Sequence, residues 1–256
     1  VMDRTRDIRR EYAYAELRRA DLAEQPLDQF KSWLDHALTK AVPDATAMAL
    51  ATADDQGMPS VRIVLLKDFN ADGFVWFSDQ RSEKGRALAA NPYAELLFHW
   101  RELDRQVRIR GLVHLLSEQA ADDYFNSRPQ ASQWAAAASE QSQPIDSRAA
   151  LEARYTKVSN PGEHPVPRPQ SWVGFCLQPL AYEFWQGREG RLHDRFRFQR
   201  ASLMQNSGLS NGCNPDRQRT VVVMPSVCLI LIFLCCHRAD LAFGATYANW
   251  GKYKRA

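Results

Sequence analysis

The sequence predicts an α+β fold built on an antiparallel β-barrel with flanking helices. Two observations lead to this prediction: many short runs rich in β-branched and aromatic residues are separated by turn residues, and a few helical stretches lie between them. The chain has 256 residues, 45% of them hydrophobic and 25% charged, which suits one large globular domain or two small ones.

The first predicted element is a helix at residues 26–40. Its apolar side chains, Phe30 among them, recur at helical spacing, and Pro26 suits the first turn of a helix. The pattern then changes to strands separated by turns, and Asp72-Gly73 is a favourable tight-turn pair. We expect these strands at residues 45–53, 60–69 and 74–78.

Helices and strands alternate through the rest of the body. Pro92 stops a short helix, Ser117 caps another whose first turn is acidic, and Pro129 suits the start of a third. A proline-rich loop at 160–170 precedes the last strands. We expect strands at 93–100, 105–116, 171–186 and 191–200, and helices at 82–92, 117–128 and 151–158.

Several classes of function are excluded. The net charge of +3 and the lack of a long Lys/Arg block argue against a nucleic-acid-binding protein. No CxxC, HExxH, GxGxxG or GxxxxGK[ST] motif occurs, so we expect no metal site and none of the common nucleotide-binding loops. The first residues mix arginines with Asp3 and Asp7 and no apolar run follows, so we expect neither a secretory signal nor a transit peptide, and a cytoplasmic location.

The stretch GRLHDRF raises a question about three cationic side chains. On a strand, Arg191, His193 and Arg195 would share one face. Such a row is either a solvated edge strand, whose charges prevent aggregation, or a wall against an anionic or electron-rich ligand. Taken alone, the stretch favours the solvated edge strand, because most charged side chains at a surface are simply solvated, and the rest of the chain must decide.

Two other stretches carry candidate anion-binding residues. In YFNSRPQAS, Pro129 suits a first helical turn, which exposes unpaired N–H groups, and Arg128 and Ser132 flank it. The alternative is an ordinary joint between two helices. Arg62 and Lys67 bound the segment RIVLLK, where strict alternation places them on opposite faces, so one ligand would contact both only if the strand bends.

The sequence changes character after Arg200. Residues 201–220 are loop-like, and residues 221–236 form an apolar run interrupted by Pro225. This run is shorter than the roughly 20 residues that span a bilayer, so we favour a buried segment, or one foreign to the parent fold, over a membrane span.

Seven stretches, in this order, resemble the pyridoxine/pyridoxamine 5′-phosphate oxidase family: SVRIVLLK, RQVRIRG, YFNSRPQASQ, SEQS, SW-x-GF, EFWQG and RLHDRF. The resemblance covers residues 9–200 and implies an FMN-binding split β-barrel of Greek-key type, forming a homodimer with flavin sites at the subunit interface. It also implies an oxidoreductase of vitamin B6 metabolism. Such a flavoprotein converts pyridoxamine or pyridoxine 5′-phosphate to pyridoxal 5′-phosphate. Dioxygen is the acceptor, giving hydrogen peroxide, and ammonia is released from the amine.

The same resemblance assigns site residues. Both ligands carry a phosphate dianion, so two separate cationic groups are expected. For FMN it implies Arg62, Ile63, Val64, Leu65, Leu66, Lys67, Phe77, Ser78, Lys84, Gln106, Gln141, Ser142, Trp185 and Arg195. For the substrate it implies Arg9, Arg10, Glu11, Tyr12, Lys67, Tyr124, Arg128, Ser132, Arg191, Leu192 and His193.

Arg191 and His193 are the expected catalytic residues. The resemblance places both at the substrate ring, where we expect Arg191 to pack over the pyridine face and His193 to contact a ring substituent. Alignment of the substrate carbon with flavin N5 is the protein's main task, because the flavin carries the chemistry. No dedicated general base is evident in the sequence, and positioning alone supplies much of the acceleration.

The chain departs from the family pattern in two places. Glu83 stands where the family usually has an arginine, and a carboxylate there would weaken FMN binding unless it turns to solvent or Arg81 or Arg86 compensates. Residues 201–256 do not match the family's ending, so we expect a flavin-binding domain at 1–200 followed by an atypical tail. The barrel would then lack its last strand and expose apolar surface.

Two other functions are considered beside the oxidase. One is a non-catalytic flavin- or pyridoxal-phosphate-binding protein, with the same fold disabled by Glu83 or by the altered ending. The other is a membrane-tethered form anchored by residues 221–236. Anaerobic bleaching of the flavin by pyridoxamine 5′-phosphate separates enzyme from binder, and recovery without detergent excludes the anchor.

Overall fold

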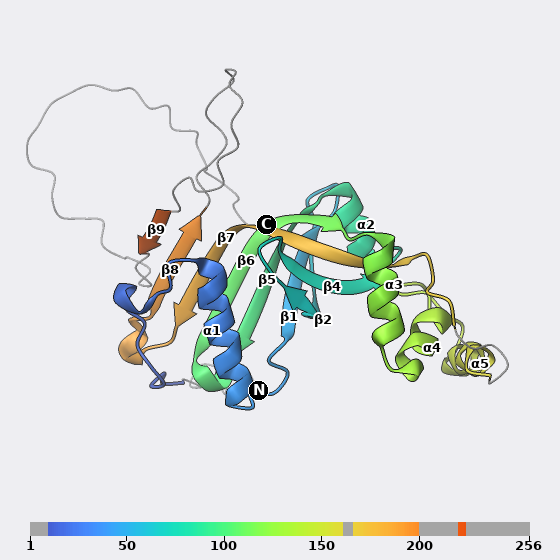
Figure 1. The fold of residues 1–256 in the computed structure, drawn as a ribbon, viewed down its shortest axis with the longest axis horizontal. Helices are drawn as coiled ribbons and strands as arrows, with labels where there is room; N and C mark the ends of the chain where they lie inside the picture. Colours follow the sequence, from blue (N-terminus) through green and yellow to red (C-terminus); the bar gives the residue numbers. More distant parts are fainter. Residues whose placement is uncertain (1–9, 161–165, 200–219, 224–256) are drawn as a thin grey trace, which may run out of the picture. The chain divides into compact units, whose positions relative to one another are not determined.

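The computed structural model describes residues 10–160, 166–199 and 220–223, all within one compact unit, Val1–Ser226. Figure 1 labels its elements. The helices are α1 (Pro26–Thr39), α2 (Glu83–Ala90), α3 (Glu118–Ser127), α4 (Gln130–Ala138) and α5 (Arg148–Val158). The strands are β1 (Ala47–Ala53), β2 (Pro59–Leu65), β3 (Asp68–Phe69), β4 (Phe74–Asp79), β5 (Tyr93–Trp100), β6 (Arg105–Leu115), β7 (Trp172–Gln186), β8 (Asp194–Gln199) and β9 (Thr220–Val223).

The strands form an antiparallel sheet that closes on itself. Hydrogen-bonded neighbours follow the order β2-β1-β5-β6-β7-β4-β3, and β2 and β3 are consecutive pieces of one segment. The Leu66 N–H donates to the Thr46 carbonyl, beside β1, and the Lys67 N–H donates to the Val75 carbonyl of β4, both at 2.9 Å. The series of pairings therefore returns to its starting segment, and the predicted antiparallel barrel with flanking helices is confirmed.

The expectation of one continuous strand at residues 60–69 is wrong. β2 ends at Leu65, and the chain bends before β3 begins at Asp68. The bend occurs because the segment exchanges β1 for β4 as its hydrogen-bonding partner. Arg62 and Lys67 therefore do not belong to one uninterrupted alternation.

β7 is shared between two parts of the sheet. Its first half pairs with β4 and its second half with β8, while β6 pairs with it along almost its whole length. β4 and β8 therefore share the edge of β7 opposite β6, and Figure 1 shows β8 and β9 continuing the sheet beside the second half of β7. The register of β6 and β7 shifts at Gly111, where a Cβ would lie only 2.1 Å from the Gln178 carbonyl oxygen. Glycine is therefore required where the two backbones meet.

Helix α1 packs its apolar side chains onto the barrel. The Phe30 ring lies 4.9 Å from the rings of Phe74 (β4) and Phe98 (β5), measured between centroids. Trp33 lies 5.4 Å from Phe184 of β7, edge to face. All five side chains are buried, and burial of each contributes about 1.5–3 kcal/mol. The predicted helix at 26–40 thus ties strands from different parts of the chain into one core.

The strand that was expected to be missing is in part present. Thr220–Val223 forms β9, which pairs antiparallel with β8. The expectation that β8 lacks a following strand is therefore wrong for this stretch. The unpaired N–H and C=O groups along the edge of β8 allow an extended segment to pair with it, even where the sequence does not match the family. The domain boundary at residue 200 stays a prediction.

Most of the apolar run at 221–236 lies outside the described residues, so its burial or membrane insertion stays untested. Among the helices that the structure describes, none combines the length and apolar composition needed to cross a bilayer.

Candidate functional site

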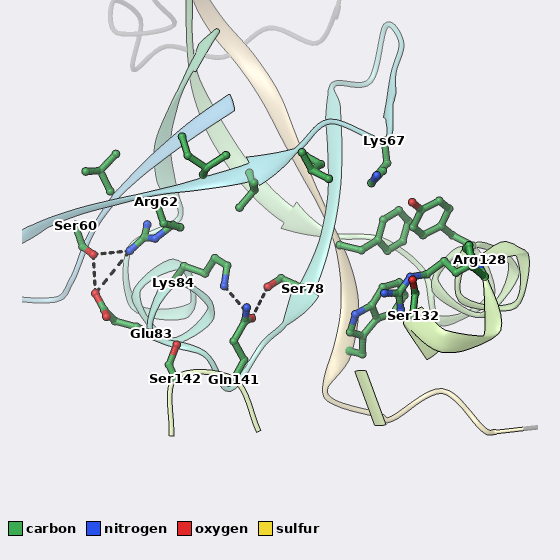
Figure 2. Close-up of a pocket in the computed structure, with 18 residues that line it drawn as sticks. Ser60, Arg62, Lys67, Ser78, Glu83, Lys84, Arg128, Ser132, Gln141 and Ser142 are labelled. Carbon is green, nitrogen blue, oxygen red and sulfur yellow. Dashed lines mark hydrogen bonds and ion pairs between the residues drawn. The ribbon is translucent and has the colours of Figure 1, made fainter. Parts of the chain in front are cut away.

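A cavity of about 680 Å³ opens beside β2, α2 and the joint between α3 and α4. Figure 2 shows two clusters of polar and cationic side chains within it. Arg62 and Lys84 belong to the first cluster, and Lys67, Arg128 and Ser132 to the second. One cavity therefore holds two separate cationic groups, as the sequence predicts for two phosphate-bearing ligands.

Arg62 of β2 is held firmly in the first cluster. Its Nη1 donates to Thr52 Oγ1 (2.8 Å) and to the Leu50 carbonyl (3.1 Å), and its Nη2 donates to the Ser60 hydroxyl. Only 20% of its side chain is exposed, and burial lowers the pKa of Arg62, although the guanidinium stays charged. The guanidinium is therefore a fixed positive charge on the cavity wall.

Lys84 is a buried cation without a carboxylate partner among the described residues. Its Nζ donates to Ser82 Oγ (3.1 Å) and to Gln141 Oε1 (2.9 Å), both of which are neutral acceptors. Burial, with a smaller contribution from the nearby Arg62 guanidinium, lowers the pKa of Lys84 to about 8. A buried amine near a second cation and the N-terminal turn of α2 suits an anionic ligand.

Aromatic rings support the second cluster. Phe77 of β4 stacks on Tyr124 of α3 with ring centroids 4.1 Å apart, and on Trp172 of β7 at 5.2 Å. The Arg128 guanidinium lies 4.7 Å from the centroid of the Trp172 ring. Its Nη1 is buried and has no hydrogen-bond partner within the described part of the chain. An unpaired, desolvated guanidinium donor on a cavity wall suits a phosphate group.

Lys67 lines the same cavity as Arg62, although strict alternation would separate them. The sequence predicts that the two side chains meet one site only if the strand bends, and the chain does bend at Leu66. Figure 2 shows Lys67 on the side of Arg128 and Ser132, away from Arg62. The two ends of the RIVLLK segment thus serve different clusters.

A second group of predicted residues forms a row across the sheet, outside the cavity. Gln106 of β6 is directly opposite Trp185 of β7, which is directly opposite Arg195 of β8. Directly opposite residues share one face of a sheet, so the three side chains are neighbours. We call them the β6–β8 row. Arg195 Nη2 donates to Glu183 Oε2 (2.7 Å), while Arg195 Nε is buried without a partner in the described residues.

The N-terminal segment lies against this row. The Tyr12 ring packs edge-on against Trp185 and His193, at centroid distances of 5.5 and 5.0 Å. Arg10 forms an ion pair with the buried Asp104 at 2.5 Å. The segment that the family resemblance places over the substrate is therefore anchored at the row and not at the cavity.

Arg191 does not lie on a strand. It closes a short 3₁₀ turn, Glu189–Arg191, with φ of 62°, directly after Gly190 with φ of 64°, and β8 begins only at Asp194. The prediction of one strand face shared by Arg191, His193 and Arg195 is therefore wrong, because alternation requires extended backbone.

His193 is oriented by the main chain of the same turn. Its Nδ1 accepts a hydrogen bond from the Arg188 N–H (3.1 Å). Burial, followed by the charge of Arg191, lowers the pKa of His193, which favours the neutral ring at pH 7. With Nδ1 as acceptor, the neutral ring carries its proton on Nε2 and offers that N–H to a ligand.

The structure divides most of the predicted residues into two groups, and four residues belong to neither. Leu66 is buried in the core, Glu11 and Leu192 are exposed, and Arg9 lies outside the described residues. The cavity is lined by Arg62, Ile63, Val64, Leu65, Lys67, Phe77, Ser78, Lys84, Tyr124, Arg128, Ser132, Gln141 and Ser142. Outside it lie Arg10, Tyr12, Gln106, Trp185, Arg191, His193 and Arg195.

Among the cavity residues that were not predicted as site residues, Ser60 and Trp172 make contacts that give them a role. Ser60 bonds to Arg62, and Trp172 supports Arg128. The signal for Ser60 was available, because Ser60 and Arg62 are two residues apart and share a strand face. Trp172 belongs to the SW-x-GF motif, but its stacking partners come from other elements, so the motif alone did not give it a role.

Glu83 also lines the cavity, and neither expected compensation occurs in the described residues. Arg81 pairs with Asp79 at 2.7 Å, and Arg86 donates to the Arg81 carbonyl. Glu83 instead approaches Arg62, with Oε1 3.6 Å from Nη2. The carboxylate therefore faces the first cationic cluster.

Comparison with known families gives two matches. The family described as "Pyridoxamine 5'-phosphate oxidase" matches residues 34–160. The family described as "Pyridoxine 5'-phosphate oxidase C-terminal dimerisation region" matches residues 172–212, twelve residues beyond the end of the resemblance at residue 200. Together they include the cavity and the β6–β8 row.

Curated relatives match over nearly their whole length. A pyridoxine/pyridoxamine 5′-phosphate oxidase of Herminiimonas arsenicoxydans is 51% identical over 192 residues, which cover 75% of this chain and 91% of the relative. The corresponding oxidase 1 of Hydrogenovibrio crunogenus is 46% identical over 81% of this chain and 96% of its own length.

Solved structures share the fold. PhzG from Burkholderia lata, determined with tetrahydrophenazine-1-carboxylic acid, has a TM-score of 0.72 and 29% identity and covers 80% of this chain and 95% of its own. An FMN-binding protein of Nostoc punctiforme has a TM-score of 0.58 and 19% identity over 79% of this chain and 99% of its own. The second likeness shows the fold alone.

Proposed function

The chain belongs to the pyridoxine/pyridoxamine 5′-phosphate oxidase family, and on this premise we propose that it is an FMN-dependent oxidase that makes pyridoxal 5′-phosphate. Its substrates are pyridoxamine and pyridoxine 5′-phosphate, with dioxygen as the acceptor, hydrogen peroxide as a product, and ammonia released from the amine. The observation that carries the proposal is the single cavity with two cationic clusters, one for each phosphate.

The first cluster fits the FMN phosphate. Lys84 is a buried amine whose described hydrogen-bond acceptors are neutral, and Arg62 is a fixed guanidinium on the same wall. A phosphate dianion would neutralise both charges and also meet the N-terminal turn of α2. Gln141 and Ser78, already linked by a 2.8 Å hydrogen bond, supply polar contacts beside it.

The second cluster fits the substrate phosphate. Arg128 has a buried, unpaired Nη1 on a wall that also carries Lys67, Tyr124 and Ser132. Because Trp172 lies against the guanidinium, its donors face a restricted volume. This arrangement favours a compact anion with several acceptor oxygens.

The position of the β6–β8 row supports a site shared between two copies of the chain. It lies outside the cavity, yet the resemblance assigns Gln106, Trp185 and Arg195 to the flavin. The cavity is bordered by three exposed apolar side chains of β2: Val61 is 69% exposed, Ile63 66% and Leu65 45%. An exposed apolar patch of this kind supports a contact with another subunit. We propose a homodimer in which each cavity is completed by the partner's β6–β8 row.

The proposed mechanism is one of binding and alignment. FMN supplies the redox chemistry when bound. Arg128 and Lys67 fix the substrate's phosphate end, and Arg191 of the second copy packs over the pyridine ring. His193 offers its Nε2–H to a ring substituent. Holding the substrate carbon in one orientation in this way converts binding energy into rate.

An anaerobic titration with pyridoxamine 5′-phosphate tests the proposed reaction. Purified protein loaded with FMN is expected to lose its visible flavin absorbance on adding the substrate, and to release hydrogen peroxide when oxygen is readmitted. A protein that stays yellow at saturating substrate would instead be a non-catalytic binder.

Mixed dimers test whether the site is shared. Arg128→Ala removes a cavity residue and Arg191→Ala removes a residue beside the row, so each pure dimer has two defective sites. A hybrid carries both defects in one site and leaves the other intact. Random pairing is therefore expected to restore about a quarter of wild-type activity. Activity that stays at the level of the pure variants would place each site within one chain.

The affinity for FMN is expected to fall as the pH rises above 8. Burial lowers the pKa of Lys84 to about 8, and a bound dianion favours its charged form. Above pH 8, binding must then take up a proton, so the dissociation constant rises by up to about tenfold per pH unit from this group. Titrations between pH 7 and 10 measure this slope.

Lys84→Met supplies the control for that slope. It removes the titrating group, so its weaker affinity is expected to vary less with pH than that of the wild type. An equal slope in the variant would assign the pH dependence to another group.

A further inference from the structure

Glu83 places a carboxylate inside a cavity that is otherwise built for anions. It is the first residue of α2, directly after the Ser82 N-cap, and it lines the cavity together with Arg62 and Lys84. A glutamate at this position of a helix normally only complements the helix dipole. Here Glu83 also contacts polar side chains of the cavity wall.

Glu83 occupies the donors of the first cluster. The Ser60 hydroxyl donates to Glu83 Oε1 at 2.6 Å, and Arg62 Nη2 lies 3.6 Å from the same oxygen. Arg62 Nη2 also donates to Ser60 Oγ, so the three side chains close a triangle, which Figure 2 shows. The carboxylate therefore uses two groups that a phosphate entering this cluster would need.

The two ion-pair partners differ in their freedom to move. The Arg62 side chain is 20% exposed and is tied to β1 through Thr52 and Leu50. The Glu83 side chain is 63% exposed and has solvent to turn into. An incoming anion would therefore displace Glu83, while Arg62 stays in place.

We propose that Glu83 is an internal competitor for the FMN phosphate, which lowers the affinity of the cavity for FMN relative to flavins without a phosphate. The inference rests on the proposed function, in which the first cluster holds that phosphate. It makes Glu83 a determinant of how strongly the phosphate contributes to flavin recognition. Removing the charge frees Ser60 and Arg62 and ends the repulsion of the dianion.

The test is an equilibrium titration of the apoprotein, followed by quenching of flavin fluorescence, with FMN and with riboflavin. Glu83→Gln keeps the size and shape of the side chain and removes the charge, and its amide oxygen is a weaker acceptor for Ser60 and Arg62 than the carboxylate. It is expected to lower the dissociation constant for FMN about tenfold and to leave that for riboflavin unchanged.

Glu118→Gln is the matched control. Glu118 is the first residue of α3 after the Ser117 N-cap, as Glu83 is in α2, but it does not line the cavity. It is expected to leave both affinities unchanged, which separates the cavity contact from a general effect on a helix end.

Two results would overturn the inference. An FMN affinity in Glu83→Gln that is unchanged or weaker, with normal riboflavin binding, overturns it and leaves the proposed function standing. A failure of the wild type and both variants to bind either flavin overturns the inference and the proposed function together.

Discussion

Replacing Arg128 with alanine is expected to raise the KM for pyridoxamine 5′-phosphate by about two to three orders of magnitude, while the protein keeps its FMN. Arg128 Nη1 is a buried donor with no partner in the described residues, and its guanidinium is packed on Trp172. Loss of a desolvated, charge-assisted contact to a dianion costs far more than loss of an exposed ion pair. FMN is expected to stay because its proposed phosphate contacts, Arg62 and Lys84, lie in the other cluster.

Steady-state kinetics and the flavin content of the purified protein together measure this effect. Arg128→Lys keeps the charge but loses the planar guanidinium, so we expect an intermediate KM. Arg148→Ala, on the exposed surface of α5, is the control and is expected to change neither value. An unchanged KM in Arg128→Ala, or a matching loss of FMN, would show that Arg128 does not serve the substrate phosphate.

Replacing Arg191 with alanine is expected to slow reduction of the bound flavin about a thousandfold, with FMN retained. Arg191 is exposed in the turn between β7 and β8, so its side chain is free to meet a ligand. Its proposed role is to hold the pyridine ring, and loss of alignment lowers the rate of the chemical step more than it weakens cofactor binding.

Stopped-flow absorbance under anaerobic conditions gives the reduction rate, and flavin content gives FMN retention. Because Arg191 has φ of 62°, Arg191→Gly removes the side chain without backbone strain and is expected to match Arg191→Ala. A glycine variant that is as fast as the wild type would mean that the alanine result reflects the backbone. Equal losses of FMN and of reduction would reassign Arg191 to the cofactor.

Local patterns predicted most of the fold. The helix at 26–40 and the strands of the barrel lie close to their expected positions, because apolar periodicity directly reports which face of an element is buried. The pattern failed where backbone direction changes. The bend at Leu66 depends on hydrogen bonds to two distant segments of the chain. The turn that holds Arg191 depends on the left-handed conformation of Gly190. Neither can be recognised from the spacing of apolar and polar residues.

The candidate site was predicted as a set of residues and not as an arrangement. Its cationic and aromatic members were identified from motifs, because phosphate and flavin binding need those side chains. Ser60 and Trp172 were missed as contributors, since their partners lie on other elements. The contact between Glu83 and Arg62 was not among the compensations considered.

By itself, the sequence determined the family and the barrel and predicted two cationic groups, because these follow from residue types in short motifs. Only the tertiary structure decided that Arg62 and Lys67 line one cavity, that the β6–β8 row lies outside it, and that Glu83 pairs with Arg62. The physical reason is that strand register and the bend between β2 and β3 set which side chains meet. Both are fixed by pairings between segments far apart in the chain and by the core around Phe30.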